Sequence, residues 1–250
     1  MLLECERISR RFGGVHAVAD VDLAVAPGQV FGLIGPNGAG KTTLVNLISG
    51  HLRVDSGAIR FAGADVTRLA PHELSARGIA RTFQGVRLFK GLSALENVLV
   101  GRHARMRSDV LRRLWPRGAP DRLDRERAGL LLERVGLTRP YALAGGLAYG
   151  DQRRLEIARA LASEPRLLIL DEPAAGMNLA ESKRLRELMR ALVAEGLTIV
   201  LIEHDVRLVM DTCERVAVLN FGRKIAEGAP AEIQASPAVR EAYLGTEDVA

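Results

Sequence analysis

The chain has 250 residues, an apolar fraction of 48% and a charged fraction of 26%, the proportions of an ordinary globular protein with one large domain. No apolar run approaches the roughly 18 residues that cross a bilayer, and the charged residues among the first dozen positions argue against a secretory leader. Two cysteines without metal-ligand spacing exclude a disulfide framework. We therefore expect a protein that stays in the cytoplasm.

The first sixty residues predict an antiparallel sheet. Short apolar segments at Leu2–Ile8, Val21–Val25 and Ala58–Phe61 are separated by turn residues such as Gly13-Gly14 and Pro27-Gly28. Segments joined by turns of this kind pair with their neighbours in sequence, so we expect a small β-subdomain at the N-terminus.

From residue 30 onward the pattern changes to continuous apolar segments of strand length. They are Val30–Ile34, Arg166–Leu170, Thr198–Ile202 and Arg215–Leu219. Such segments are typical of strands that are covered on both faces, and helix-length stretches such as Arg153–Ser163 and Glu181–Glu195 lie between them. This alternation predicts a mostly parallel sheet of the α/β class. Residues from about 89 to 162 predict helices only, so we expect a single domain over residues 1–250 that contains a helical subdomain.

A glycine-rich motif, G-x-x-x-x-G-K-T, follows the strand at Val30–Ile34 directly, and a helical pattern follows at Leu44–Ser49. The glycines let the backbone wrap a polyphosphate with its N–H groups, and the start of the helix adds its positive end. Lys41 would reach the β- and γ-phosphates, and the Thr42 hydroxyl would bind Mg²⁺. The candidate phosphate-binding residues are Gly35, Pro36, Asn37, Gly38, Ala39, Gly40, Lys41, Thr42 and Thr43.

A second motif ends the apolar segment Leu167–Leu170 with two carboxylates. Asp171 has the position of a metal ligand opposite the phosphate loop, and Glu172 has the position from which a carboxylate polarises an attacking water. Both lie at the carboxyl end of a predicted strand, where α/β sheets bind ligands. The phosphate loop alone leaves kinases, GTPases and many ATPases open, and the paired carboxylates favour an ATPase.

With these two motifs the chain resembles the ATP-binding cassette (ABC) family over essentially its whole length. The resemblance implies a P-loop NTPase fold that uses ATP and Mg²⁺ for hydrolysis. It assigns Phe12 to stacking on adenine and His204 to the γ-phosphate as a second catalytic residue beside Glu172. It also assigns Gln84 to the metal, which Thr42, Gln84 and Asp171 would hold partly through water.

The family's signature loop, commonly L-S-G-G-Q, corresponds here to Leu147, Ala148, Tyr149, Gly150, Asp151 and Gln152. In the family this loop, at the start of a helix, contacts the ATP of a second subunit. Ala148 lacks the usual serine hydroxyl, Asp151 replaces a glutamine, and Asn178 replaces an aspartate after the Glu172 motif. We expect Ala148 and Asp151 to weaken activation of the partner subunit, although Asp151 could instead cap its own helix.

Finer motifs are similar to the ATPase subunits of branched-chain (hydrophobic) amino acid importers. They are Leu147–Gly150, Arg81–Phe89, Asp171–Gly176 and the terminal Ala242-Tyr243-Leu244-Gly245. The resemblance implies a complex at the cytoplasmic face of a bacterial inner membrane. Its other members would be two integral-membrane permeases, a second ATPase that forms a homo- or heterodimer closed by ATP, and a periplasmic binding protein. Transporters for urea, amides, aromatic acids or lipopolysaccharide, and soluble non-transport ATPases, remain as alternatives.

The net charge of +5 equals that of one stretch, because residues 102–127 hold nine arginines and four acids. A solvated helical insert is the favoured interpretation, and a face near anionic lipid headgroups is the second. Nucleic acid is not expected as a partner. Trp115, at the start of a stretch interrupted by Pro and Gly that ends at Pro120, is expected to be a packing anchor.

Overall fold

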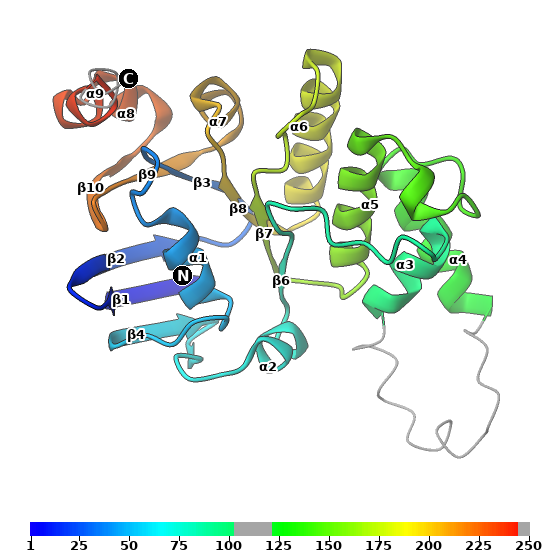
Figure 1. The fold of residues 1–250 in the computed structure, drawn as a ribbon, viewed down its shortest axis with the longest axis horizontal. Coiled ribbons are helices and arrows are strands. Elements are labelled where there is room, and N and C mark those ends of the chain that lie inside the picture. Colours follow the sequence, from blue (N-terminus) through cyan, green and yellow to red (C-terminus); the bar gives the residue numbers. More distant parts are fainter. Residues whose placement is uncertain (103–121, 245–250) are drawn as a thin grey trace.

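The computed structural model describes residues 1–102 and 122–244. Trp115, Gly245 and most of the Arg-rich stretch therefore lie outside the described residues. The described chain forms two sheets, with helices grouped around the larger one (Figure 1).

The N-terminal sheet is antiparallel and has the strand order β2-β1-β4-β5. Its strands are β1 (Leu3–Phe12), β2 (Val15–Val25), β4 (Ser56–Phe61) and β5 (Ala64–Asp65). The strands β1 and β2 are longer than predicted and continue to the Gly13-Gly14 turn. Shifts of register along this pair, with Arg7 and Asp20 at positive φ, break the alternation of apolar and polar residues. The strand bounds predicted from this alternation were consequently too short.

The larger sheet has six strands in the order β10-β9-β3-β8-β7-β6. They are β3 (Val30–Ile34), β6 (Ile79–Arg81), β7 (Leu167–Asp171), β8 (Thr198–Ile202), β9 (Arg215–Asn220) and β10 (Arg223–Gly228). Every pair in it is parallel except β9 with β10, which confirms the mostly parallel α/β fold. The strands β6 and β10 were not predicted, because β6 has three residues and β10 is polar and only half-buried.

Each central strand contributes to two apolar cores, one on each face of the six-stranded sheet. In β7, Leu167 and Ile169 face the core shared with the antiparallel sheet, whereas Leu168 and Leu170 face the core shared with the other helices. All four are fully buried. Successive side chains in a strand point to opposite faces, so a strand covered on both sides reads as a continuous apolar segment.

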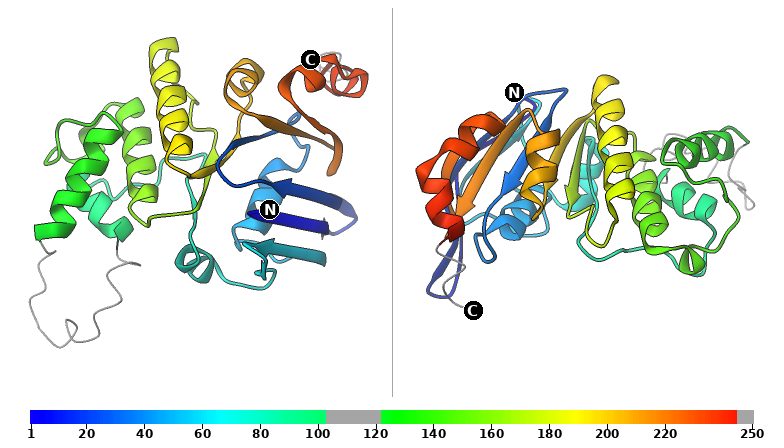
Figure 2. Two further views of the ribbon diagram at one scale, coloured as in Figure 1. Left: turned by 180° about the vertical axis from the view of Figure 1, so that it is seen from behind. Right: turned by 90° about the horizontal axis from the view of Figure 1, so that it is seen from above.

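The helices divide between these two cores. The helix α1 (Lys41–Ile48) packs with both sheets, and α2 (Pro71–Ala76) lies near β6. The helices α3 (Ala94–Arg102), α4 (Arg122–Arg134) and α5 (Tyr149–Leu161), with the short turn η3 (Ala144–Gly146), gather at the end of the molecule away from the antiparallel sheet (Figures 1 and 2). The remaining helices are α6 (Leu179–Ala194), α7 (Val206–Thr212), α8 (Pro230–Ala235) and α9 (Pro237–Leu244).

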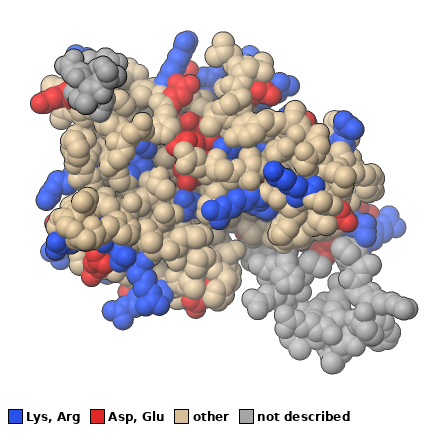
Figure 3. All heavy atoms as spheres, viewed as in Figure 1, with Lys and Arg blue, Asp and Glu red and all other residues tan. Residues whose placement is uncertain are grey.

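Within the described ranges, no helix has the length and apolar character needed to cross a membrane. On the face shown in Figure 3, Lys and Arg side chains are scattered among Asp and Glu rather than joined into one basic area.

Candidate functional site

The phosphate loop connects the end of β3 to the start of α1, so the unpaired N–H groups of the first helical turn lie next to it. Two of its glycines leave no room for a side chain. A Cβ on Gly35 would lie 2.2 Å from the carbonyl oxygen of Leu219, and one on Gly40 would lie 2.3 Å from that of Ala17. Gly40 also has a φ of +100°, which strains any other residue. The motif therefore needs these glycines to pack against β9 and β2.

Lys41 is the first residue of α1, and its side chain is buried. Its Nζ donates hydrogen bonds to the carbonyl oxygens of Gly35 at 2.6 Å and Pro36 at 2.9 Å. Burial lowers the pKa of Lys41, while the charges of Glu172 and Asp171 act in the opposite direction. The ammonium group is thus held against its own loop, by carbonyl partners that a phosphate oxygen could replace.

A pocket of about 460 Å³ opens beside the loop. Its lining comprises Val15, His16, Ala17, residues 37–43, Gln84, Glu172, His204 and Phe221. The structure thus brings most of the predicted phosphate-loop residues together with three more residues that the sequence singled out. The volume is in the range of small-molecule sites.

Glu172 lines this pocket and lies directly after β7, with a φ of +50°. Its Oε1 is 2.5 Å from His204 Nε2, and its Oε2 accepts a hydrogen bond from Gln84 Nε2 at 2.9 Å. A carboxylate accepts hydrogen bonds, and a His204 tautomer with its proton on Nε2 would donate to it in this arrangement. Two side chains from distant segments therefore fix both oxygens of Glu172.

Asp171 ends β7 and is buried in an ion pair with Arg81, the last residue of β6. Arg81 Nη2 lies 2.8 Å from Asp171 Oδ2. Arg81 begins the Arg81–Phe89 motif, three residues before Gln84, but the sequence assigned it no role in the site.

The described residues contain no group of three or more His, Cys, Asp or Glu side chains that could hold a metal ion. A Mg²⁺ site built here would use one carboxylate, a hydroxyl and the phosphates of the nucleotide, which is how Mg²⁺ is commonly held. Asp171 and Thr42 supply donors of that kind on neighbouring elements, β7 and α1.

Phe12 is the last residue of β1 and is 46% exposed. The Arg10 guanidinium stacks on its ring, with Cζ 5.0 Å from the ring centroid. Phe12 does not line the pocket beside the phosphate loop, whereas Val15 and His16 of the next strand do.

The signature loop, residues 147–152, is not part of that pocket. It forms the start of α5, which begins at Tyr149 rather than at the predicted Arg153. Ala148 occupies the N-cap position and makes no side-chain cap. Tyr149 is 47% exposed, so the loop presents a ring and a helix start at the surface.

Asp151 does not cap its helix, because it lies in the first turn and forms an ion pair with Arg154. Arg154 also donates to the Gly136 carbonyl oxygen at 3.0 Å, so the added carboxylate is matched by an anchored cation. Asn178 does act as a cap. Its Oδ1 accepts from Glu181 N at 3.0 Å, and Glu181 Oε2 accepts from Asn178 N at 2.9 Å, which starts α6 with a reciprocal capping box.

Two further residues that contact the loops of the site, Glu203 and Tyr243, were not predicted to do so from the sequence. Glu203, just before His204, accepts hydrogen bonds from Ala174 N at 2.8 Å and from His204 N at 3.3 Å, and burial raises its pKa. Tyr243 of α9 forms a hydrogen bond with the Gly35 backbone that partly offsets the rise of its pKa on burial. Glu203 thus connects the segments that follow β7 and β8, and Tyr243 connects α9 to the phosphate loop.

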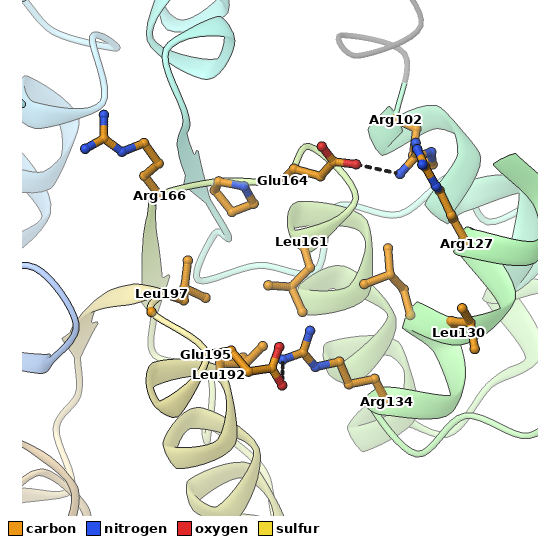
Figure 4. A pocket seen from close by; sticks show the side chains of 13 residues that line it. Arg102, Arg127, Leu130, Arg134, Leu161, Glu164, Arg166, Leu192, Glu195 and Leu197 are labelled. Atoms are coloured by element: carbon orange, nitrogen blue, oxygen red, sulfur yellow. Dashed lines mark hydrogen bonds and ion pairs between the residues drawn. The ribbon is translucent and has the colours of Figure 1, made fainter. Parts of the chain in front are cut away.

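A different pocket, of about 610 Å³, lies between α4 and the ends of α5 and α6 (Figure 4). Leucines form much of its lining, and the Arg102–Glu164 and Arg134–Glu195 ion pairs lie at it. It holds none of the residues that the sequence analysis assigned to catalysis or ATP binding.

The chain is similar to known proteins in both sequence and structure. The sequence model of the ABC transporter family matches residues 18–175, and that of the branched-chain amino acid ATP-binding cassette transporter family matches residues 223–249. The chain is 45% identical over 249 residues to the high-affinity branched-chain amino acid transport ATP-binding protein BraF of Pseudomonas aeruginosa, covering 98% of each chain. It is 42% identical over 251 residues to LivG of Escherichia coli, a protein of the same description, again covering 98% of each.

Among solved structures, the ADP conformation of MJ1267, an ATP-binding cassette of an ABC transporter, superposes with a TM-score of 0.86. The identity is 34%, and the match covers 98% of both chains.

Proposed function

The chain belongs to the ABC transporter family, and from that premise we propose that it is the ATP-hydrolysing subunit of an importer for branched-chain or other hydrophobic amino acids. The family places ATP binding and hydrolysis in the chain. The observation that carries the mechanism is Glu172, which His204 and Gln84 hold in the lining of the phosphate-loop pocket.

Hydrolysis in this site follows from the residues around the loop. The N–H groups of the loop and the ammonium of Lys41 bind the phosphates, and Lys41 exchanges its two carbonyl partners for phosphate oxygens. Glu172 orients the attacking water and accepts its proton, and His204 Nε2–H donates to the γ-phosphate or back to Glu172. Mg²⁺ held by Thr42, Asp171 and Gln84 would neutralise the charge on the phosphates.

Gln84 links this chemistry to the surface. The segment that leads to it, residues 79–83, borders a groove of about 320 Å³ between α2, α3 and the end of α5. Phe89 and Val100, both large and exposed, lie in this groove. We assign the groove to a membrane-embedded permease subunit, because occupancy there would move the segment that ends in a contact to Glu172.

The exposed signature loop supports an ATP-closed dimer. In one chain the loop lies outside the nucleotide pocket, and a second copy or a homologous ATPase would bring its own helix start to the bound phosphates. The Asp151–Arg154 ion pair reduces the negative charge at that helix start. The full complex would then hold two ATPases and two permeases at the cytoplasmic face of the inner membrane, with a periplasmic binding protein supplying the substrate.

Reconstitution tests this proposal. The chain is placed in liposomes with candidate permease subunits and a candidate binding protein, and uptake of radiolabelled leucine is compared with uptake of urea, an amide and phenylalanine. ATP-dependent leucine uptake is expected. ATPase activity that responds to none of the four solutes would refute the proposed substrate class and leave the ATPase assignment standing.

A further inference from the structure

We propose that Arg81 is a positioning residue for ATP hydrolysis, because its guanidinium fixes the Asp171 carboxylate against the helix that carries Thr42. The inference rests on the proposed function and gives a role to Arg81, which the sequence showed only as the first residue of the Arg81–Phe89 motif.

The ion pair between Arg81 and Asp171 is buried. Their side chains are 6% and 4% exposed, and Arg81 Nη2 lies 2.8 Å from Asp171 Oδ2. A carboxylate this deep in the protein loses its hydration, and the hydrogen bond from the guanidinium compensates for part of that loss. The pair engages Oδ2, and Oδ1 is then the oxygen that a divalent cation could use.

The second terminal nitrogen of the same guanidinium reaches α1. Arg81 Nη1 donates to Asn46 Oδ1 at 2.6 Å and to Ser49 Oγ at 2.9 Å. Asn46 lies one helical turn beyond Thr42, and Ser49 is the residue that ends the helix. One planar group thus connects α1, β6 and β7, and sets how far Thr42 lies from Asp171.

The orientation of the guanidinium is itself fixed. Its Cζ lies over the Phe83 ring at 4.9 Å from the centroid, and the His51 ring packs edge-on against Phe83 at 5.4 Å. Because a guanidinium is a rigid fork, holding its plane fixes both nitrogens at once. A lysine at this position would keep the charge and lose the second connection.

The experiment measures ATP binding by the purified full-length chain, with a fluorescent ATP analogue, as Mg²⁺ is titrated and again in a chelator. The variants are Arg81→Lys and the pair Asn46→Ala/Ser49→Ala, which removes the α1 acceptors without leaving a buried charge unpaired. We expect the Mg²⁺ concentration for half-maximal binding to rise about tenfold, as for loss of one hydrogen bond to a charged group. Binding in the chelator should stay within about twofold of the parent.

Arg102→Lys is the matched control. Arg102 is also a buried arginine, paired with Asp124 at 3.1 Å and Glu164 at 3.2 Å, and it lies at the pocket of Figure 4 rather than at the phosphate loop. Its Mg²⁺ dependence should equal that of the parent. An unchanged Mg²⁺ requirement in both test variants would overturn the inference, and so would a lower one, which would show that Arg81 only repels the metal. A parent that binds ATP without any Mg²⁺ effect would instead refute the proposed metal site.

Discussion

Glu172→Gln tests the catalytic arrangement most directly. The substitution keeps the size of the side chain and removes its ability to accept a proton from water. General bases contribute about 10²- to 10⁴-fold, or about 2.7–5.4 kcal/mol of barrier. His204 Nε2 at 2.5 Å and Gln84 Nε2 at 2.9 Å hold both oxygens of Glu172, so the substitution removes a base that stands in a fixed position. Turnover of ATP should therefore fall at least about a hundredfold.

Nucleotide binding should survive in the same variant. Lys41 and the loop still bind the phosphates, and removal of one negative charge beside the γ-phosphate reduces repulsion. We expect ATP affinity at least equal to that of the parent and a longer-lived ATP-dependent dimer by size-exclusion chromatography. Glu164→Gln is the control, since Glu164 is an exposed glutamate with a similar φ of +51° away from the loop. Near-normal ATP turnover by Glu172→Gln would refute the general-base assignment.

Three further predictions concern single side chains. Lys41→Ala should lower ATP affinity by about 10- to 100-fold through loss of charge-assisted hydrogen bonds while circular dichroism stays native, and equal affinities in a titration would contradict the phosphate assignment. Asp151→Gln should not reduce ATP turnover by the isolated chain, and a clear drop would show that the Asp151–Arg154 ion pair has a positive role. For Glu203→Gln, burial raises the pKa of Glu203 above its ordinary 4.5. The free energy of unfolding of the parent therefore decreases as pH rises from that ordinary value through the raised pKa of Glu203. The decrease is about 1.4 kcal/mol for each unit by which folding raises this pKa. The stability of the variant relative to the parent should thus increase from below pH 4.5 to neutrality in urea titrations, and a pH-independent difference would exclude this origin.

The sequence pattern predicted those features whose physical cause lies within a short segment of the chain. The segments Val30–Ile34 and Thr198–Ile202 were predicted at their true bounds, because strands buried on both faces are continuously apolar. The phosphate loop could be predicted because its glycines are required where the backbone packs too closely for a side chain.

Contacts between segments that are far apart in the chain could not be predicted from the sequence. Arg81 and Asp171 are 90 positions apart, and only the parallel pairing of β6 with β7 brings them together. The roles of Phe12, His204 and the signature loop toward ATP stay predictions, since they depend on a nucleotide and a second subunit.

The helix α9 offers a practical way to watch the phosphate loop. Ala238, Glu241 and Ala242 share a pocket with Pro36 and Asn37 of the loop. Both native thiols are buried, and burial raises the pKa of Cys5 to about 12 and also raises the pKa of Cys213. Neither should react readily with a thiol-specific dye at neutral pH. A single cysteine introduced at Glu241 would accordingly take a fluorophore selectively, and its emission would report nucleotide entry and release in an otherwise native chain.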